Sequence, residues 1–175
     1  MRPHGAYKRE TTMSQKSTKG FSLVELVIVV VIIGVIAAIA VPRISRGAKG
    51  AGDSSLRGTL AGIRNAIDMY AAEHGGTFPS GTESDIVEKL TKRTSADGTV
   101  GTTAGTHIYG PYLRGGIPKL PVCDNKGDAS LSIVTGTPAG GTGTEGWVYS
   151  TDTGEFIANC ADTEEDESGI QYNQY

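Results

Sequence analysis

Histidine, cysteine and tryptophan are scarce in this chain, which has three, two and one of them among 175 residues. His4, His74 and His107 have no second ligand-type residue at a metal-binding spacing, so we expect them to be structural. No serine, cysteine or carboxylate is paired with a histidine at a spacing typical of an enzyme family. These shortages argue against an enzyme, and we predict no catalytic residue.

Basic side chains are also missing as a stripe with interleaved aromatic residues, the pattern typical of nucleic-acid binding. Lysine and arginine instead gather before residue 20, and acidic residues gather at 162–167. The 25 glycines are concentrated after residue 46, which favours a small domain rich in loops. The sequence therefore predicts one small domain and no nucleic-acid partner.

An apolar run stands out near the N-terminus. Residues 26–41 contain no polar side chain, and residues 21–41 would form about 30 Å of helix, enough to span a bilayer core. The run is too long for a secretory signal peptide. A plain membrane anchor would gain nothing from Glu25, since a charge at membrane depth costs about 2.5–3.5 kcal/mol.

The junction before this run has the sequence KGFSLVEL at residues 19–26. It resembles the prepilin processing site of type IV pilins and type II secretion pseudopilins. The resemblance implies that a prepilin peptidase cuts after Gly20 and methylates the new N-terminal Phe21. It also implies that Glu25 pairs with the N-terminal amine of a neighbouring subunit during assembly. Pro42, at the end of the apolar run, matches the same pattern and is included in the predicted assembly segment.

The resemblance and the charge pattern together divide the chain into four parts. We predict a leader at residues 1–20, a transmembrane assembly helix at 21–42, an amphipathic second half of that helix at 43–76, and a β-rich domain at 77–175. The basic leader favours a cytoplasmic N-terminus before cleavage, because Lys and Arg resist crossing the bilayer. The expected location is the bacterial inner membrane, with a single span and a periplasmic domain. Translation from Met13 would give a shorter leader of the usual kind.

The predicted fold is α+β and pilin-like, with a long N-terminal helix packed by its second half on a small antiparallel β-sheet. Apolar residues from 56 to 70 recur at helical spacing, and the sequence His74-Gly75-Gly76 ends the pattern. Glycines at 47, 50 and 52 predict an interruption of the helix, since each costs about 1 kcal/mol relative to alanine.

Shorter elements are expected further along the chain. We predict a helix at residues 83–92, a short strand at 107–113 and a further strand at 130–135. Residues 147–149 and 156–158 are expected to pair as an antiparallel hairpin across the turn between them.

Cys123 and Cys160 are expected to form a disulfide, which would stabilise the domain by roughly 3–4 kcal/mol. Two free buried thiols in a reducing compartment are the alternative, and export favours the bridge.

Patches of the domain resemble the major pseudopilin of type II secretion. They are residues 66–70, 77–79, 110–113 and 117–121. The resemblance implies a filament subunit that drives protein export across the outer membrane. Its partners would be further copies of the chain, the prepilin peptidase, an inner-membrane platform with a cytoplasmic ATPase, and minor pseudopilins.

The chain also departs from that family, because a cysteine pair is more typical of true type IV pilins. The alternative is therefore the major subunit of a type IV pilus for adhesion, motility or DNA uptake, at the cell surface.

Major pseudopilins bind calcium in a C-terminal loop, and the resemblance makes Ca²⁺ the one candidate cofactor, though none is required. Asp124, Asn125 and Asp128 place oxygen ligands around a glycine turn, and residues 162–167 supply further carboxylates. Neither segment fits a complete calcium-loop pattern. A solvated turn and a disordered acidic tail are the favoured interpretation.

Overall fold

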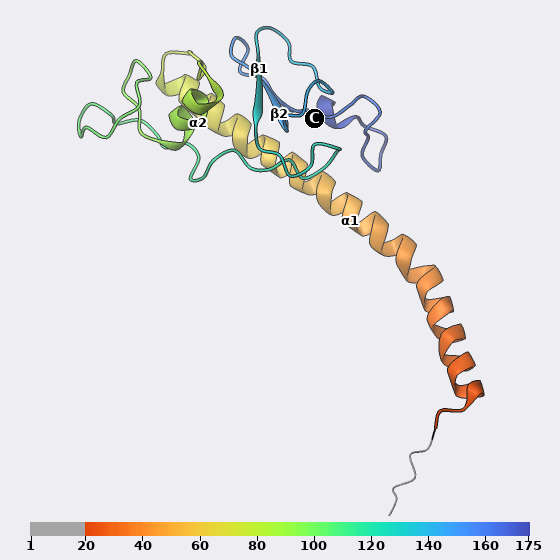
Figure 1. Ribbon diagram of the computed structural model, residues 1–175. Coiled ribbons are helices and arrows are strands. Elements are labelled where there is room, and N and C mark those ends of the chain that lie inside the picture. Colours follow the sequence, from red (N-terminus) through yellow and green to blue (C-terminus); the bar gives the residue numbers. More distant parts are fainter. Residues whose placement is uncertain (1–19) are drawn as a thin grey trace, which may run out of the picture. The chain divides into compact units, whose positions relative to one another are not determined.

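The computed structural model describes residues 20–175, so the predicted leader, apart from Gly20, lies outside the described residues. The chain divides into two compact units, the first ending at Pro42 and the second running from Arg43 to Tyr175. Helix α1, Leu23–Glu73, belongs to both units (Figure 1). Its segment Leu23–Val41 is long and apolar enough to cross a membrane, and none of it is buried.

The predicted interruption of α1 is wrong, because the helix continues through Pro42 and through all three glycines at 47, 50 and 52. Packing explains the glycine at 52, where an added Cβ would come within 3.0 Å of Val122 Cγ1. The hydroxyl of Ser54 also donates a hydrogen bond of 2.9 Å to the carbonyl of Gly50. Close packing along this turn outweighs the low helix propensity of glycine.

The second half of α1 presents the predicted apolar stripe to the core. Its five members are all buried: Leu56, Leu60, Ile63, Ile67 and Tyr70. The helix ends at Glu73, and Gly75 and Gly76 follow with positive φ. The amide of Gly76 donates to the carbonyl of Ala71 over 2.7 Å, which satisfies an orphan carbonyl of the last turn. The predicted helix end is confirmed.

Helix α2, Glu83–Thr91, confirms the expected helix at 83–92. Thr82 and Asp85 form a capping box at its start, and Ile86 and Leu90 are buried. The expected strand at 107–113 is wrong. Tyr109 makes only an isolated bridge to Thr94. Gly110 then has a φ of 67°, and the next residue, Pro111, has no N–H to donate to a ladder.

Three strands form the sheet, in the order β1-β2-β3. They are β1, Leu131–Val134; β2, Trp147–Ser150; and β3, Phe156–Ala158. The hairpin of β2 and β3 is confirmed, with Trp147 opposite Ala158. Strand β1 is parallel to β2, however, so the sheet is mixed and not antiparallel throughout. Residues 135–146, which join β1 to β2, are long enough to bring the chain back to the same end of the sheet.

One apolar core joins α1, α2 and the sheet, and all of β2 is buried within it. The polar atoms of two aromatic residues in β2 donate to backbone carbonyls. Trp147 Nε1 donates to Pro118 over 2.8 Å, and the hydroxyl of Tyr149 donates to Pro79 over 2.9 Å. A short 3₁₀ helix, η1 (Tyr172–Gln174), follows the sheet. The fold is α+β, as predicted, and consistent with the pilin-like architecture.

Candidate functional site

The start of α1 and the chain just before it contain the residues that the sequence singled out: Gly20, Phe21 and Glu25. Gly20 and Phe21 precede the helix and are exposed. Ser22 caps the helix: its carbonyl accepts from Leu26 over 3.2 Å, and its hydroxyl accepts from the amide of Val24 over 3.3 Å. The predicted cleavage position, between Gly20 and Phe21, therefore lies immediately before a capped helix.

Glu25 completes this cap, a role that the sequence analysis did not predict. Its Oε2 accepts a hydrogen bond of 3.2 Å from the amide of Ser22. This is the reciprocal contact of a capping box, and the spacing of Ser22 and Glu25 in the sequence carried the signal for it. A carboxylate here also favours the positive end of the helix dipole. The site therefore presents a negative charge, bound to its own helix start, at one end of an exposed apolar segment.

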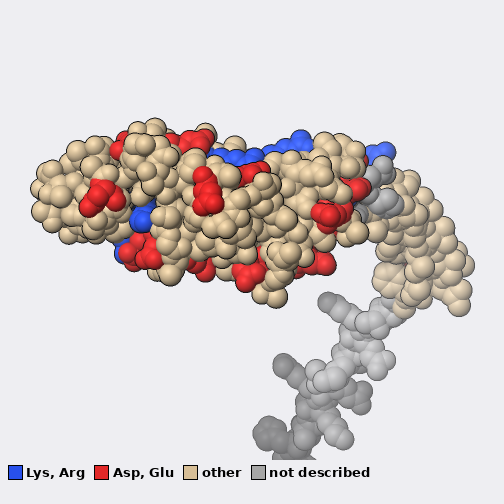
Figure 2. Space-filling model, turned by 90° about the horizontal axis from the view of Figure 1, so that it is seen from above, with Lys and Arg blue, Asp and Glu red and all other residues tan. Residues whose placement is uncertain are grey.

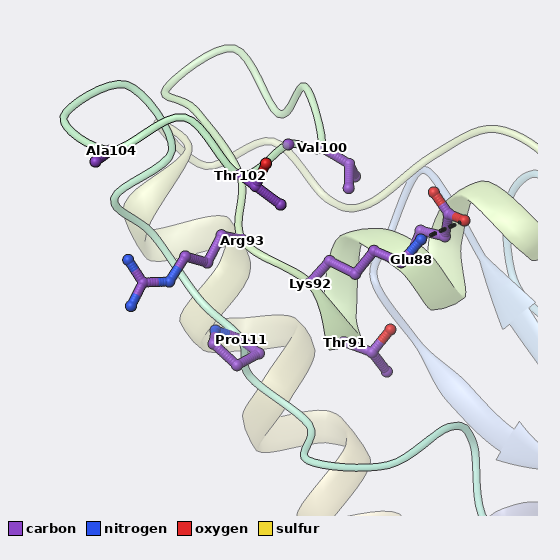
Figure 3. A pocket seen from close by; sticks show the side chains of 9 residues that line it. Glu88, Thr91, Lys92, Arg93, Val100, Thr102, Ala104 and Pro111 are labelled. Carbon is purple, nitrogen blue, oxygen red and sulfur yellow. Dashed lines mark hydrogen bonds and ion pairs between the residues drawn. The ribbon is translucent and has the colours of Figure 1, made fainter.

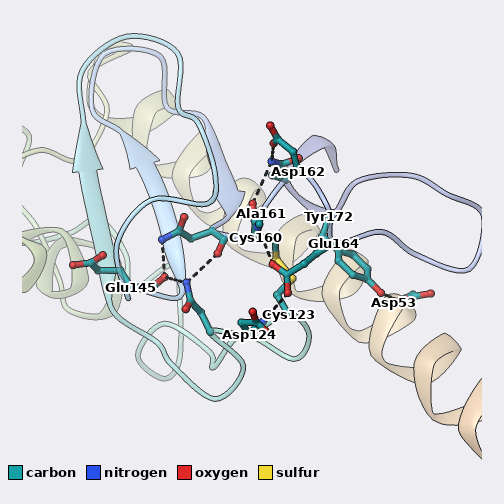
Figure 4. The surroundings of a disulfide bond; sticks show 12 residues. Asp53, Cys123, Asp124, Glu145, Cys160, Ala161, Asp162, Glu164 and Tyr172 are labelled. Atoms are coloured by element: carbon teal, nitrogen blue, oxygen red, sulfur yellow. Dashed lines mark hydrogen bonds between the residues drawn. A yellow bond between two sulfur atoms is a disulfide. The ribbon is translucent and has the colours of Figure 1, made fainter.

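Cys123 and Cys160 are joined by a disulfide, with 5.7 Å between their Cα atoms. The alternative of two free thiols is wrong. Figure 4 shows the bridge between the loop that contains Asp124 and the chain that follows β3. Beside it, the carboxylate of Glu164 accepts from the amides of Asp124 and Ala161, each over 2.8 Å. The contact from Asp124 joins the two segments beside the covalent link, and the contact from Ala161 holds Glu164 against its own segment.

Cys123, Cys160 and Glu164 also bring ligand-type atoms within 4.8 Å of one another. Both sulfurs belong to the disulfide, and a metal would require them as thiolates. The cluster is therefore a structural disulfide with a neighbouring carboxylate and not a metal centre.

Two of the three candidate calcium ligands, Asn125 and Asp128, make structural hydrogen bonds through their side chains. Asp128 Oδ1 accepts from the amide of Ser130 over 2.7 Å, from that of Gly146 over 3.2 Å, and from the Ser130 hydroxyl. The hydrogen bonds from Ser130 are the main reason that the pKa of Asp128 is lowered.

The side-chain amide nitrogen of Asn125 donates to the carbonyls of Glu145 and Asn159, over 3.0 and 3.1 Å. Asp124 is exposed. Calcium binding at these residues stays a prediction.

The acidic segment 162–167 is ordered against α1, so the expectation of a disordered tail is wrong. Asp166 is buried and accepts from the amides of Ser168 and Ile170, over 2.7 and 2.9 Å. It also accepts from Arg57 over 2.8 Å and from the hydroxyl of Tyr175. The hydrogen bond from Tyr175 contributes most to holding the pKa of Asp166 at about 2.

A second buried carboxylate, Asp53 on α1, contacts η1. Asp53 Oδ1 accepts a hydrogen bond of 2.7 Å from the hydroxyl of Tyr172 in η1. Burial raises the pKa of Tyr172, and the hydrogen bond to Asp53 raises it further. These partners are 119 residues apart, and no local sequence pattern could have paired them.

A hollow beside α2 has a volume of about 710 Å³. Glu88, Lys92, Arg93 and Pro111 contribute to its walls. Figure 3 shows Lys92 reaching toward Glu88, at 2.7 Å, while Arg93 points the other way. The charged groups of Lys92 and Arg93 therefore point in different directions. In an active site, polar groups would converge on one position.

His74 has the structural role that the sequence predicted. It is buried, its ring stacks on Tyr70 with 3.9 Å between centroids, and its Nδ1 lies 2.7 Å from the carbonyl of Tyr70. Its Nε2 lies 3.0 Å from the hydroxyl of Thr94. Nδ1 therefore contacts α1 itself, while Nε2 links the end of α1 to the loop after α2.

Comparison with protein-family models gives a match at residues 15–41, to the family described as the prokaryotic N-terminal methylation motif. The matched segment contains Gly20, Phe21 and Glu25 and ends where the apolar run ends. Comparisons with curated proteins and with solved structures give no match. The family match thus covers only the start of the chain.

Proposed function

We propose that this chain, which its methylation motif marks as type IV pilin-like, is a structural subunit of a type II secretion pseudopilus. In this proposal the prepilin peptidase cuts after Gly20 and methylates Phe21, and the processed chain polymerises through α1. The observation that carries the proposal is Glu25, a carboxylate at the start of the exposed apolar segment Leu23–Val41.

Glu25 favours assembly over permanent residence in the bilayer. In the single chain its charge has a hydrogen bond from Ser22 but no cation among the described residues. Cleavage after Gly20 creates an amine on Phe21, and a neighbouring copy can bring that amine to the carboxylate. A carboxylate accepts several hydrogen bonds, so the helix cap need not break when the amine arrives. Pairing would offset the cost of the buried charge and fix the register of the copies.

The remaining partners follow from the same proposal. The subunit would require the prepilin peptidase, an inner-membrane platform with a cytoplasmic ATPase, and minor pseudopilins, and would itself catalyse nothing. Its second unit would lie in the periplasm. The disulfide between Cys123 and Cys160 supports this location, because such bonds persist in oxidising compartments and are rare in the cytosol.

A type IV pilus is the second candidate function. The disulfide favours it, because a cysteine pair resembles the pattern of true type IV pilins more than that of pseudopilins. A filament that leaves the cell for adhesion, motility or DNA uptake would be built from the same assembly helix.

The experiment that tests both candidates together is mass spectrometry of the intact protein and of its N-terminal peptide, taken from the native membrane. The expected product begins at N-methylated Phe21. A chain that retains Gly20 and the leader would be a plain anchor, and one cut after Val41 would be a secreted domain. Either result would contradict assembly through α1.

Calcium separates the two candidates. We expect millimolar calcium to raise the melting temperature of the processed protein if it is a pseudopilin, because a ligand that binds only the folded state stabilises it. Magnesium at the same concentration is the control for ionic strength. No calcium-specific shift would favour the type IV pilus.

A further inference from the structure

A groove lies on the second unit, between α1 and the segment that follows the sheet. Its volume is about 460 Å³. Apolar and basic side chains line it: Leu60, Ala61, Ile170 and Tyr175, with Arg57 and Arg64. Ile170 is 44% exposed, so part of the apolar lining is in contact with solvent. Figure 2 shows basic side chains along part of one long edge of this unit and others among the acidic side chains of the visible face.

The walls of the groove are held in place by contacts within the chain. The guanidinium of Arg57 donates to Asp166 and to the hydroxyl of Tyr175, each over 2.8 Å, and lies 4.7 Å from the centre of the Tyr175 ring. Arg64 donates to the carbonyl of Phe156 over 2.8 and 3.0 Å and also to the backbone oxygen of Tyr175. The groove is therefore preformed, and its two arginines retain their positive charge.

A matching projection lies on the same helix. Met69 is 56% exposed, and Asp68 beside it is also exposed. A flexible, polarisable methionine is suited to filling an irregular apolar groove, and an adjacent carboxylate complements an arginine. A Cβ added at Gly58 or Gly62 would meet nothing within 4 Å, so this part of α1 leaves room for a second helix to approach.

Met69 cannot fill the groove of its own chain. It follows Ala61 by eight residues, which places it about 12 Å further along the helix and about 80° around it. The groove and the projection are thus two different surfaces on one chain. Surfaces of this kind make a heterologous contact, which generates an open helical array when the rotation does not close.

We propose that the groove of one copy receives Met69 of a second copy, with Asp68 of that copy next to Arg57 and Arg64. The inference rests on the proposed function, in which the α1 helices of successive copies run in the same direction. It specifies the contact between their second units and an axial offset of about 12 Å between helices in contact.

Cysteine crosslinking tests this contact in the full-length chain, expressed in its native host. Ala61→Cys combined with Met69→Cys is expected to give a ladder of disulfide-linked multimers after oxidation of assembled filaments. Neither substitution removes a core side chain, because both positions are exposed. Cys123 and Cys160 are bonded to each other, so the introduced thiols are the reactive ones.

The matched control combines Ala61→Cys with Ala72→Cys. Ala72 is also exposed, but it lies about 20° around the helix from Ala61, on the same side and not on that of Met69. The proposal predicts a ladder for the 61–69 pair that is at least severalfold stronger than for the 61–72 pair.

A second measurement uses Met69→Glu and Met69→Leu, which should leave the melting temperature of the monomer unchanged. We expect the glutamate to reduce filament yield severalfold and the leucine to preserve it. Normal filaments that carry N-methylated Phe21 but give no 61–69 ladder would overturn this contact and leave the proposed function intact. An unprocessed chain that forms no filaments would overturn both.

Discussion

The guanidinium of Arg57 in α1 lies 2.8 Å from the buried carboxylate of Asp166, 109 residues later in the chain. This ion pair and the hydrogen bonds to the same carboxylate fasten the segment after β3 to the helix. They also make the second unit sensitive to acid, because they depend on an ionised Asp166.

The first prediction concerns the pH dependence of stability. The pKa of Asp166 is about 2 in the folded chain, below the value of about 3.9 expected for an unfolded aspartate. Since the folded state holds the proton less tightly, the stabilisation is complete above pH 4 and is lost as the pH falls toward 2. Asp166→Asn should therefore melt below the wild type at pH 7, and the difference should shrink between pH 4 and pH 2.

Thermal melting at a series of pH values in detergent measures this effect. Asp68→Asn is the control, because it changes an exposed carboxylate on α1. A constant difference between wild type and Asp166→Asn down to pH 2 would contradict the role of the ionised carboxylate.

The second prediction concerns the disulfide. Cys123→Ser combined with Cys160→Ser should lower the free energy of unfolding by roughly 3–4 kcal/mol, because the bridge closes a loop with a sequence separation of 37 residues. Urea unfolding in oxidising and reducing buffer measures the loss. Reduction should bring the wild type to the stability of the double variant and leave the variant unchanged. Equal stability in oxidising buffer would rule out a stabilising bridge.

The third prediction concerns the turn between β2 and β3. Gly154 has a φ of 74°, and a Cβ there would overlap the ring of Phe78. Gly136 has a similar φ of 78°, but a Cβ added to it would meet nothing within 4 Å. Gly136→Ala should therefore cost about 1–2 kcal/mol from the backbone alone, and Gly154→Ala should cost about 1–3 kcal/mol more from overpacking. Equal losses in urea unfolding would show that Phe78 moves aside freely.

The fourth prediction separates the two roles of Glu25, capping and charge. Glu25→Gln keeps an oxygen that can accept from the amide of Ser22, whereas Glu25→Leu removes both the cap and the charge. Both variants should insert into the membrane. If the charge pairs with an amine of a neighbouring copy, both should also lose filaments to a similar extent. Filament yield is measured by electron microscopy after membrane fractionation. Near-normal filaments from Glu25→Gln would show that Glu25 acts only as a helix cap and that its charge is not needed for assembly.

The sequence predicted those parts of the fold that local patterns determine. The apolar spacing around Leu60, the glycines after His74 and the hairpin at Trp147 each depend on residues close together in the chain, and each is confirmed. The parallel pairing of β1 could not be predicted in this way, because a run of alternating residues does not encode the direction of its partner. At Gly52 in the continuous α1, tertiary packing against Val122 accompanies a residue whose local helix cost is about 1 kcal/mol.

The residues of the candidate site likewise divide into those that a local sequence pattern identifies and those that only long-range contacts reveal. Gly20, Phe21 and Glu25 lie within six residues, so a motif could identify them, and the family match covers all three. The capping role of Glu25 was also present in the sequence as a serine followed three residues later by a glutamate. The contacts of Asp53 with Tyr172 and of Arg57 with Asp166 join residues more than 100 positions apart, and only the folded chain reveals them.

The disulfide also determines how the second unit would respond to mechanical load. In a filament driven through its helices, a pull on α1 reaches the rest of this unit through side-chain contacts that can slide and re-form. The covalent bond between Cys123 and Cys160 cannot slide in this way. It prevents the chain between the two cysteines from being extended by force. At about 3.3–3.6 Å per residue, a sequence separation of 37 residues corresponds to roughly 120–130 Å of extended chain length, which force cannot extend while the disulfide is intact. A subunit that yields under tension would therefore remain short, with its three strands kept inside the closed loop.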